Sequence, residues 1–308
     1  MRIVVAGAGG LGGYYGGRLA KAGHEVTFIA RGDQLAALRD KGLRVESVKD
    51  PFHLPSVSAT GDPATVGAAE VVLLTVKAYD LQRAAEGLLP LIGKDTAVVP
   101  LLNGVDIAER IGAVVGMEHV LGGLAYVFSF VAGPGVIKQV SPFDRIQFGE
   151  LQGGLSDRGK RIEEAMRKAG IDAGQVADIH AALWTKFMFL APTAGMSTLT
   201  RMHIGSIRAD PDTRALLIDA MKEIEAVARA KHVALNPEIL REMIERVDGM
   251  PTDLKPSMAL DLDRGRPLEV EALSGTVARM GRELGVPTPV HQFIYAALKL
   301  HMHGHSKA

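Results

Sequence analysis

The arrangement of apolar and polar positions changes character about half-way along the chain. In the first half, continuous apolar runs alternate with segments of helical spacing, and these runs lie at 2–6, 25–30, 70–76 and 95–102. Apolar strands that alternate with helices are typical of a parallel sheet covered on both faces. The short pieces 43–47 and 53–59 favour a hairpin. The pieces within 120–149 are separated by Gly-Pro turns, and we expect them to extend the sheet as antiparallel strands.

Strand signals nearly vanish after Ser156. Helical spacing or helix-forming residues then dominate, at 156–169, 178–200, 212–231, 237–247, 267–285 and 289–302. Prolines punctuate these segments. The chain is therefore predicted to be an α/β domain over residues 1–176 followed by an all-α domain over residues 177–308. The Leu- and Met-rich segment 212–231 would bury its apolar face either within this domain or in a homodimer.

Composition and charge narrow the function classes. The 308 residues include 35 basic and 35 acidic side chains, and this zero net charge argues against a general binder of nucleic acid or anionic membranes. No apolar run reaches the roughly 18 residues that span a bilayer, and the N-terminus does not resemble a signal peptide. The chain has no cysteine, which excludes disulfides, thiolate catalysis and cysteine-bound metals. We expect a cytoplasmic protein.

A glycine motif follows the first apolar run. Gly7, Gly9 and Gly12 form a G-x-G-x-x-G pattern, preceded by a strand and followed by a helix and a second strand. Gly7 allows a tight turn, Gly9 lets the backbone approach a pyrophosphate, and Gly12 lets the helix pack against the strand. The pyrophosphate would sit on the N–H groups at the positive helix end. This predicts a Rossmann-like dinucleotide-binding domain; the alternative is a glycine-rich turn without a ligand.

The end of the second strand bears on which dinucleotide is bound. NAD enzymes usually carry Asp or Glu there, for the ribose 2′-hydroxyl, whereas this strand ends in Arg31. A guanidinium binds a 2′-phosphate that a carboxylate would repel, so the sequence favours NADP or NADPH as the cofactor. Asp33, two residues later, keeps NAD open, and Arg31 as a solvated loop charge is a further alternative.

Two other strand ends carry polar side chains. Lys77 lies just past the run 70–76, and Asn103 lies just past the run 95–102. Ligands of open α/β sheets bind outside the carboxyl ends of the strands, so both residues are candidates for the cofactor and substrate site. Asn103 also fits a turn residue before Gly104, because asparagine tolerates left-handed backbone.

The stretch "WTKFMFLAPTAG", residues 184–195, reads as a buried helix that contains Lys186. A lysine there either extends its amine to water or is held in a cleft for chemistry. Considered alone, the segment favours the first interpretation.

A second polar cluster follows in "PSMALDLDRGRPLEVEALSGTV". Pro256 can open a helix that puts Ser257 and Asp261 on one face. Glu269 and Glu271 fall near the start of the next helix, where acidic side chains are usually surface residues that favour the helix dipole. No Ser-His-Asp set and no metal-ligand spacing are evident. The alternate histidines of the tail "HMHGHSKA" fit a frayed terminus better than a metal site.

These motifs together resemble the ketopantoate reductase (2-dehydropantoate 2-reductase) family. The resemblance rests on "GAGGLGGYYGGRLAKAGHEVTFIAR", "TVKAYD", "LLNGVD", "LWTKF" and the "PSM…D…E" block, in this order and over about residues 1–300. It implies NADPH-dependent reduction of the 2-oxo group of ketopantoate to pantoate, for coenzyme A biosynthesis, with a small 2-oxo acid as the substrate.

The resemblance also implies roles for individual residues. Lys186 would be the general acid, and Glu269 would hold it and the substrate hydroxyl. Asn103 and Lys77 would line the nicotinamide and substrate cleft, and Ser257 would bind the substrate carboxylate. Arg31 would hold the 2′-phosphate. An ammonium held near a carboxylate can stabilise the forming alkoxide and donate a proton to it.

One departure from the family concerns the substrate. Well-studied members carry asparagine four and eight residues after the lysine, where this chain has Leu190 and Ala194. Losing these amides can change substrate preference by orders of magnitude, unless Thr193 or Ser197 replaces them. The alternatives are a related reductase of another branched 2-oxo acid or β-hydroxy acid, and a non-catalytic NADP-binding sensor.

Overall fold

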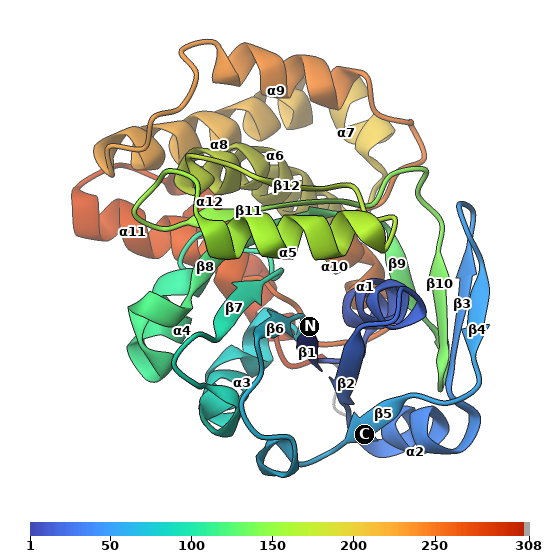
Figure 1. Ribbon diagram of the computed structural model, residues 1–308. Coiled ribbons are helices and arrows are strands. Elements are labelled where there is room, and N and C mark those ends of the chain that lie inside the picture. Colours follow the sequence, from blue (N-terminus) through green and yellow to red (C-terminus); the bar gives the residue numbers. More distant parts are fainter. Residues whose placement is uncertain (305–308) are drawn as a thin grey trace. The chain divides into compact units, whose positions relative to one another are not determined.

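The computed structural model describes residues 1–304 and divides into two compact units (Figure 1). Unit 1 comprises Met1–Leu102 and Asp106–Ile179. Unit 2 joins Asn103–Val105 to the chain from His180 onward. Within residues 1–304, no helix is long and apolar enough to cross a membrane, and no three His, Asp or Glu side chains are placed to hold a metal. His305 of the tail motif lies outside the described residues.

The central element of unit 1 is a parallel five-stranded sheet, as the apolar runs predict. Its order is β5-β2-β1-β6-β7, and its strands are β1 (Arg2–Ala6), β2 (Glu25–Ile29), β5 (Ser58–Thr60), β6 (Val71–Leu74) and β7 (Ala97–Pro100). In the register, Ile3 of β1 lies between Val26 and Val71. Every residue of β6 and β7 is buried, because helices and further strands cover both faces.

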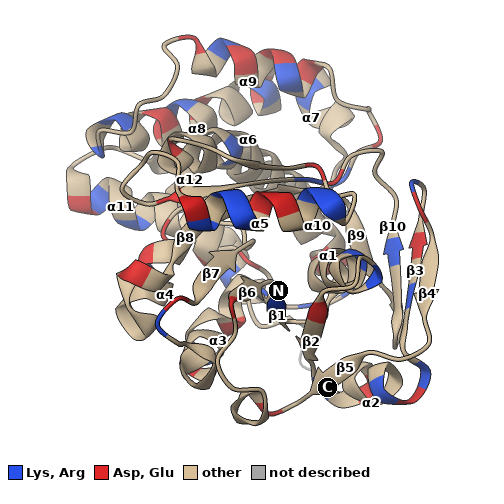
Figure 2. Cartoon of the chain, in the orientation of Figure 1, with Lys and Arg blue, Asp and Glu red and all other residues tan. Residues whose placement is uncertain are grey.

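Helices connect these strands. They are α1 (Gly10–Lys21), α2 (Gly32–Lys41), α3 (Leu81–Leu88), α4 (Ile107–Val115) and α5 (Asp157–Lys168), with short 3₁₀ turns at Pro63–Thr65, Ala78–Asp80, Leu89–Leu91 and Met117–His119. On α5 and on α9 of unit 2 (Ile239–Asp248), basic and acidic side chains alternate, so neither helix presents a charge of one sign (Figure 2).

The prediction for 120–149 needs correction. β8 (Leu121–Tyr126) and β11 (Arg145–Glu150) do pair in antiparallel fashion, but with β12 (Ala173–Gln175) they form a separate sheet. A bridge between Val98 and Val120 links this sheet to the central one. Strand spacing along the chain does not reveal which edge a strand joins.

β9 (Ser129–Gly133) and β10 (Val136–Gln139) belong to a second sheet of order β4-β3-β10-β9. The predicted hairpin is present in part, as β3 (Leu43–Ser47) and β4 (Phe52–Leu54), whereas residues 58–59 of its second piece belong to β5 of the central sheet. β10 runs parallel to β3, a pairing between segments about 90 residues apart that no local pattern signals.

Helix α1 lies between the central sheet and this second sheet (Figure 1). A Cβ at Gly16 would lie 2.6 Å from Phe28 Cε1 on the central-sheet side. A Cβ at Gly13 would lie 2.6 Å from Ile137 Cγ1, and one at Gly17 would lie 2.9 Å from Leu43 Cδ2, both on the second-sheet side. The repeated glycine pairs of α1 therefore let two sheets approach one helix.

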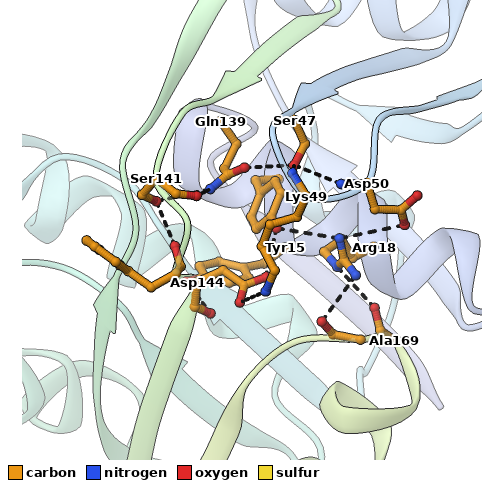
Figure 3. A network of polar contacts seen from close by, with 12 residues as sticks. Tyr15, Arg18, Ser47, Lys49, Asp50, Gln139, Ser141, Asp144 and Ala169 are labelled. Carbon is orange, nitrogen blue, oxygen red and sulfur yellow. Dashed lines mark hydrogen bonds and ion pairs between the residues drawn. The ribbon is translucent and has the colours of Figure 1, made fainter.

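The remaining side of α1 carries a buried polar network (Figure 3). Asp144, 1% exposed, accepts hydrogen bonds from the Tyr14 hydroxyl at 2.7 Å and from Lys49 Nζ at 2.6 Å. Burial and the Asp144 carboxylate raise the pKa of Tyr14. Arg18 donates to the carbonyls of Ala169 and Gly170 at the end of α5, each at 3.1 Å. The network ties α1 to two loops and to α5, with each buried charge satisfied.

Unit 2 is helical, as predicted. Its helices are α6 (Ile179–Thr200), α7 (Ile204–Ala209), α8 (Pro211–Ala230), α9, α10 (Ser257–Asp263), α11 (Thr276–Leu284) and α12 (Pro289–Leu298), with a 3₁₀ turn at Lys299–His301. α7 was not predicted, and the segment predicted as one helix over 267–285 begins with a π-helical turn at Glu271–Gly275. The apolar face of α8 packs into the core of unit 2.

Buried polar groups also order unit 2. The Glu223 carboxylate accepts the backbone N–H groups of Val290 at 2.7 Å and His291 at 3.0 Å, and so caps α12. The His291 ring is fully buried between the Ser274 hydroxyl and the Ala220 carbonyl, at 3.1 and 3.0 Å. Burial lowers the pKa of His291 to about 4, so this ring is neutral at physiological pH.

The packing of α1 predicts the effect of Gly16→Ala. Alanine improves helix propensity by about 0.5–1 kcal/mol, but overpacking a rigid core costs about 1–3 kcal/mol. We therefore expect a net loss, seen as a thermal unfolding midpoint a few degrees lower by circular dichroism. Gly174→Ala is the control, because a Cβ there meets nothing within 4 Å. A Gly16→Ala variant as stable as the control would contradict the close packing.

Candidate active site

A pocket of about 360 Å³ lies within unit 1, at the carboxyl ends of β1, β2 and β6. Its walls come from the turn between β1 and α1, the end of β2, the segment after β6, and α3. The lining residues include Gly7, Ala8, Gly9, Ala30, Arg31, Gln34, Thr75, Lys77, Asp80, Arg83 and Leu88. The strand order changes direction at this edge, which is where open α/β sheets bind ligands.

The three motif glycines differ in their surroundings. Gly7 has φ of +107°, a conformation that side chains disfavour, and a Cβ there would lie 3.0 Å from Val76 N. A Cβ at Gly12 would lie 2.1 Å from the Gly7 carbonyl oxygen. Nothing lies within 4 Å of the Cβ position of Gly9, which caps α1 without a side-chain hydrogen bond. This geometry suits an anion held against the start of α1.

Side chains around the turn keep it in shape. The Thr75 hydroxyl donates to the Gly7 carbonyl at 2.6 Å. The Gln34 side chain donates to the Ala8 carbonyl at 2.9 Å and accepts the N–H of Gly135 at 3.0 Å. The sequence interpretation had assigned neither residue. Gln34 follows the recognised run 25–30, and Thr75 lies near the end of the recognised run 70–76, so their positions were a usable signal.

Basic residues line two sides of the pocket. Arg31 is the exposed N-cap of α2, and Lys77 begins the 3₁₀ turn after β6. Arg83 on α3 lines the same pocket and was not singled out in the sequence. Asp80 lies there too, so the pocket contains three cations and one carboxylate. That balance suits a ligand with several negative charges.

Unit 2 brings Lys186 and Asn103 into contact. Lys186 Nζ on α6 donates to Asn103 Oδ1 at 3.0 Å, and both side chains are half-buried. Asn103 does not have left-handed backbone; Gly104 takes the unusual conformation instead, with φ of +133°. A turn residue with left-handed backbone therefore does not explain why position 103 is an asparagine.

The surroundings of Lys186 suit proton transfer. Burial lowers the pKa of Lys186 from its ordinary 10.5 to about 8, opposed by the Glu269 carboxylate and assisted by the Arg246 guanidinium. Glu269 is only 6% exposed, so the surface interpretation is wrong for this residue. That interpretation holds for Glu271, which is exposed and accepts the Tyr295 hydroxyl at 2.5 Å. A lysine with a pKa near 8 gives up a proton readily near neutral pH.

The predicted site residues therefore divide between the units. Gly7, Gly9, Gly12, Arg31 and Lys77 belong to unit 1, and Asn103, Lys186, Ser257 and Glu269 belong to unit 2. Ser257 is the exposed first residue of α10, and Asp261, on the same helix, is 8% exposed.

Comparison with known proteins agrees with both units. The ketopantoate reductase PanE/ApbA family pattern matches residues 3–153, and the C-terminal pattern of the same family matches residues 178–302. The chain belongs to the ketopantoate reductase family. The resemblance inferred from the motifs is thus confirmed, as is the α/β and all-α architecture, and this family is one of oxidoreductases.

Individual members of the ketopantoate reductase family match the whole chain. It is 32% identical to the uncharacterized oxidoreductase YkpB of Bacillus subtilis, over 98% of this chain and 99% of that one. It is 31% identical to 2-dehydropantoate 2-reductase of Nostoc, over 97% and 94%. The crystal structure of 2-dehydropantoate 2-reductase from Geobacter metallireducens aligns with a TM-score of 0.91, at 31% identity and over 97% and 99%.

The structure shows where Leu190 and Ala194 lie, the two positions at which this chain departs from well-studied members of the family. Ala194 is 1% exposed in the core of unit 2, and Leu190 is half-buried against that core. The Thr193 hydroxyl donates to the Phe189 and Leu190 carbonyls of its own helix, at 2.8 and 3.1 Å. Ser197 is fully buried, and its oxygen has no hydrogen-bond partner among residues 1–304. Thr193 is thus engaged with its own helix, and Ser197 is closed to solvent.

Titration of Lys186 tests this description of the site. After reductive ¹³C-methylation, its NMR signal, assigned by its loss in Lys186→Arg, should titrate with a pKa near 8. Glu269→Gln should lower this pKa further, because the carboxylate stabilises the ammonium. A pKa that stays near 10.5 in the wild type, or that rises in Glu269→Gln, would contradict the described surroundings.

Proposed function

We propose that the protein reduces the 2-oxo group of 2-dehydropantoate to give pantoate, with NADPH as the hydride donor. The observation that carries this proposal is the Lys186 ammonium, bonded to Asn103 and lowered in pKa to about 8. Family membership and the two relatives named as 2-dehydropantoate 2-reductases support the choice of substrate.

The proposed chemistry needs one hydride and one proton. When bound, the nicotinamide would supply the hydride for the carbonyl carbon of the substrate. Lys186 stabilises the negative charge that develops on the oxygen and transfers a proton from Nζ to it. The amine left behind takes a proton from solvent. Glu269 keeps Lys186 charged before the reaction, and Asn103 fixes the direction of the ammonium.

The pocket of unit 1 is the proposed cofactor site. The start of α1, which no side chain caps, and Gly9 suit the pyrophosphate. Lys77, at the turn after β6, lines the same pocket. Arg31 would bind the 2′-phosphate, since a guanidinium forms paired hydrogen bonds to phosphate oxygens. Ser257, at the exposed start of α10, would contribute a hydroxyl to the substrate carboxylate.

A second candidate is reduction of another branched 2-oxo acid with the same Lys186 chemistry. Leu190 and Ala194 favour it, because they place apolar groups where other family members carry amides. A substrate with an apolar side chain leaves no polar group unpaired beside them.

A comparison of substrates tests both candidates. We expect 2-dehydropantoate to have a higher kcat/KM than 2-oxoisovalerate and its homologues, measured by oxidation of NADPH. Lys186→Ala should lower kcat by about 10²–10⁴-fold while NADPH affinity stays near that of the wild type. Equal or better turnover of the other acids would favour the second candidate. Full activity of Lys186→Ala would contradict the proposed mechanism.

The choice of cofactor is tested by Arg31→Gln. Loss of charge-assisted hydrogen bonds to the 2′-phosphate should weaken NADPH binding by about 10- to 100-fold. NADH lacks that phosphate, so its affinity in the same variant is the internal control and should change little. If both affinities fall equally, or neither falls, Arg31 does not bind the 2′-phosphate.

A further inference from the structure

Arg83 is an exposed residue of α3 that lines the pocket of unit 1. The other lining residues of α3 and of the turn before it are Asp80, Ala84, Gly87 and Leu88. Intervals of three and four residues put all five side chains on one face of the helix. Arg83 therefore belongs to the face that α3 turns toward the pocket.

A series of contacts places Arg31 and Arg83 at the same end of this pocket. The N–H of Ala30, the residue before Arg31, donates to the carbonyl of the last residue of β5 at 3.0 Å. Pro63, three residues further on, lies against α3. Its Cγ is 3.9 Å from the Cβ position of Gly87, one helical turn after Arg83. One short segment thus joins the end of β2 to α3, and a basic side chain stands at each side of it.

Both guanidinium groups are available to a ligand. Across residues 1–304, neither the Arg31 nor the Arg83 side chain has a hydrogen-bond, ion-pair or ring partner, and Asp80 does not pair with Arg83. The pocket of about 360 Å³ is near the lower end of the range for ligand pockets, about 300–1,000 Å³, so its walls lie close together. Two like charges in one small pocket repel each other, and an anion bound to both removes that repulsion.

The two dinucleotides differ in the group that they would bring to this end of the pocket. NADPH carries a 2′-phosphate on its adenosine ribose, with a charge of about −1.5 to −2 near pH 7, and NADH carries a neutral hydroxyl. A dianion matches two guanidinium groups, each of which can donate parallel N–H bonds to phosphate oxygens. The neutral adenine ring needs neither charge, because Ala30, Ala84 and Leu88 supply apolar surface for it.

We propose that Arg83 binds the 2′-phosphate of NADPH together with Arg31, and is thus a second residue that selects NADPH over NADH. This inference rests on the proposed function, which assigns that phosphate to Arg31. Arg31 approaches it from the end of β2 and Arg83 from α3, so the phosphate is held from two walls of the pocket. The position after the second strand identifies Arg31 in the sequence, whereas only the fold brings Arg83 to the same group.

Binding of cofactor fragments tests this inference without any turnover. The probes are adenosine 2′,5′-bisphosphate and adenosine 5′-monophosphate, which differ only in the 2′-phosphate, and Kd is measured by isothermal titration calorimetry. Arg83→Gln should weaken binding of the bisphosphate by about 10- to 100-fold and leave that of the monophosphate near the wild-type value. Arg83→Lys keeps the charge but loses the parallel N–H groups, and should show a smaller loss.

A double variant shows whether the two arginines serve one group. Arg31→Gln/Arg83→Gln should bind NADPH no more tightly than NADH, whereas each single variant should keep part of the preference for NADPH. Arg110→Gln is the matched control, because Arg110 is exposed on the neighbouring helix α4 and does not line the pocket. Its loss should change the Kd of neither fragment. Far-UV circular dichroism monitors folding of each variant.

The outcomes separate this inference from the proposed function. If Arg83→Gln weakens both fragments equally, Arg83 contacts the adenosine and not its 2′-phosphate; if it weakens neither, Arg83 is a solvated surface charge. Either result overturns the inference while Arg31 and the proposed reaction stand. If the wild type binds NADPH no more tightly than NADH, the proposed cofactor is wrong and the inference with it. A loss confined to the bisphosphate supports the inference.

Discussion

The packing of α1 between two sheets is the constraint on which the rest of unit 1 depends. Gly12 and Gly16 bring the helix against the central sheet, and Gly13 and Gly17 bring the second sheet against the helix. Because the backbone itself makes these contacts, the start of α1 has a fixed position relative to β1. The proposed cofactor pocket is built around that start, so its shape follows from the same glycines.

The remaining side of α1 is held by polar contacts and not by glycine packing. Arg18 of α1 donates to the Ala169 carbonyl at the end of α5. The buried Asp144 carboxylate accepts hydrogen bonds from Tyr14 of α1 and from Lys49. Removing one partner would leave the other buried and unpaired, which is costly. The polar network thus specifies one arrangement of these loops, whereas the glycine contacts supply close packing.

Unit 2 applies charge in a different way. Burial pushes Lys186 toward its neutral form, and Glu269 restores part of its preference for the charged form. The result is an acid poised near physiological pH. In the proposed reaction, Leu190 and Ala194 stand in place of amides, so polar recognition of the substrate would fall to remaining groups such as Asn103 and Ser257.

The sequence by itself determined the class of fold and the family, because both depend on local signals. Apolar runs, glycine spacing and helix punctuation are properties of neighbouring residues, and they were enough to expect the central sheet, most helices and the glycine turn. The candidates Lys186 and Asn103 also came from local context. The same local reasoning favoured a surface position for Glu269, since its place near a helix start resembles that of many exposed acids, and only the family resemblance implied a role for it in the site.

Only the tertiary structure decided which segments meet. The pairing of β10 with β3 and the hydrogen bond from Lys186 to Asn103 join residues distant in the chain, and the burial of Glu269 was likewise visible only in the structure. Such contacts depend on side-chain burial and on the free energy of the whole packed unit, which no short pattern encodes. The sequence does not show whether a charged side chain lies in solvent or in a core. Its pKa depends on its partners and on its loss of water, and only the tertiary structure sets these.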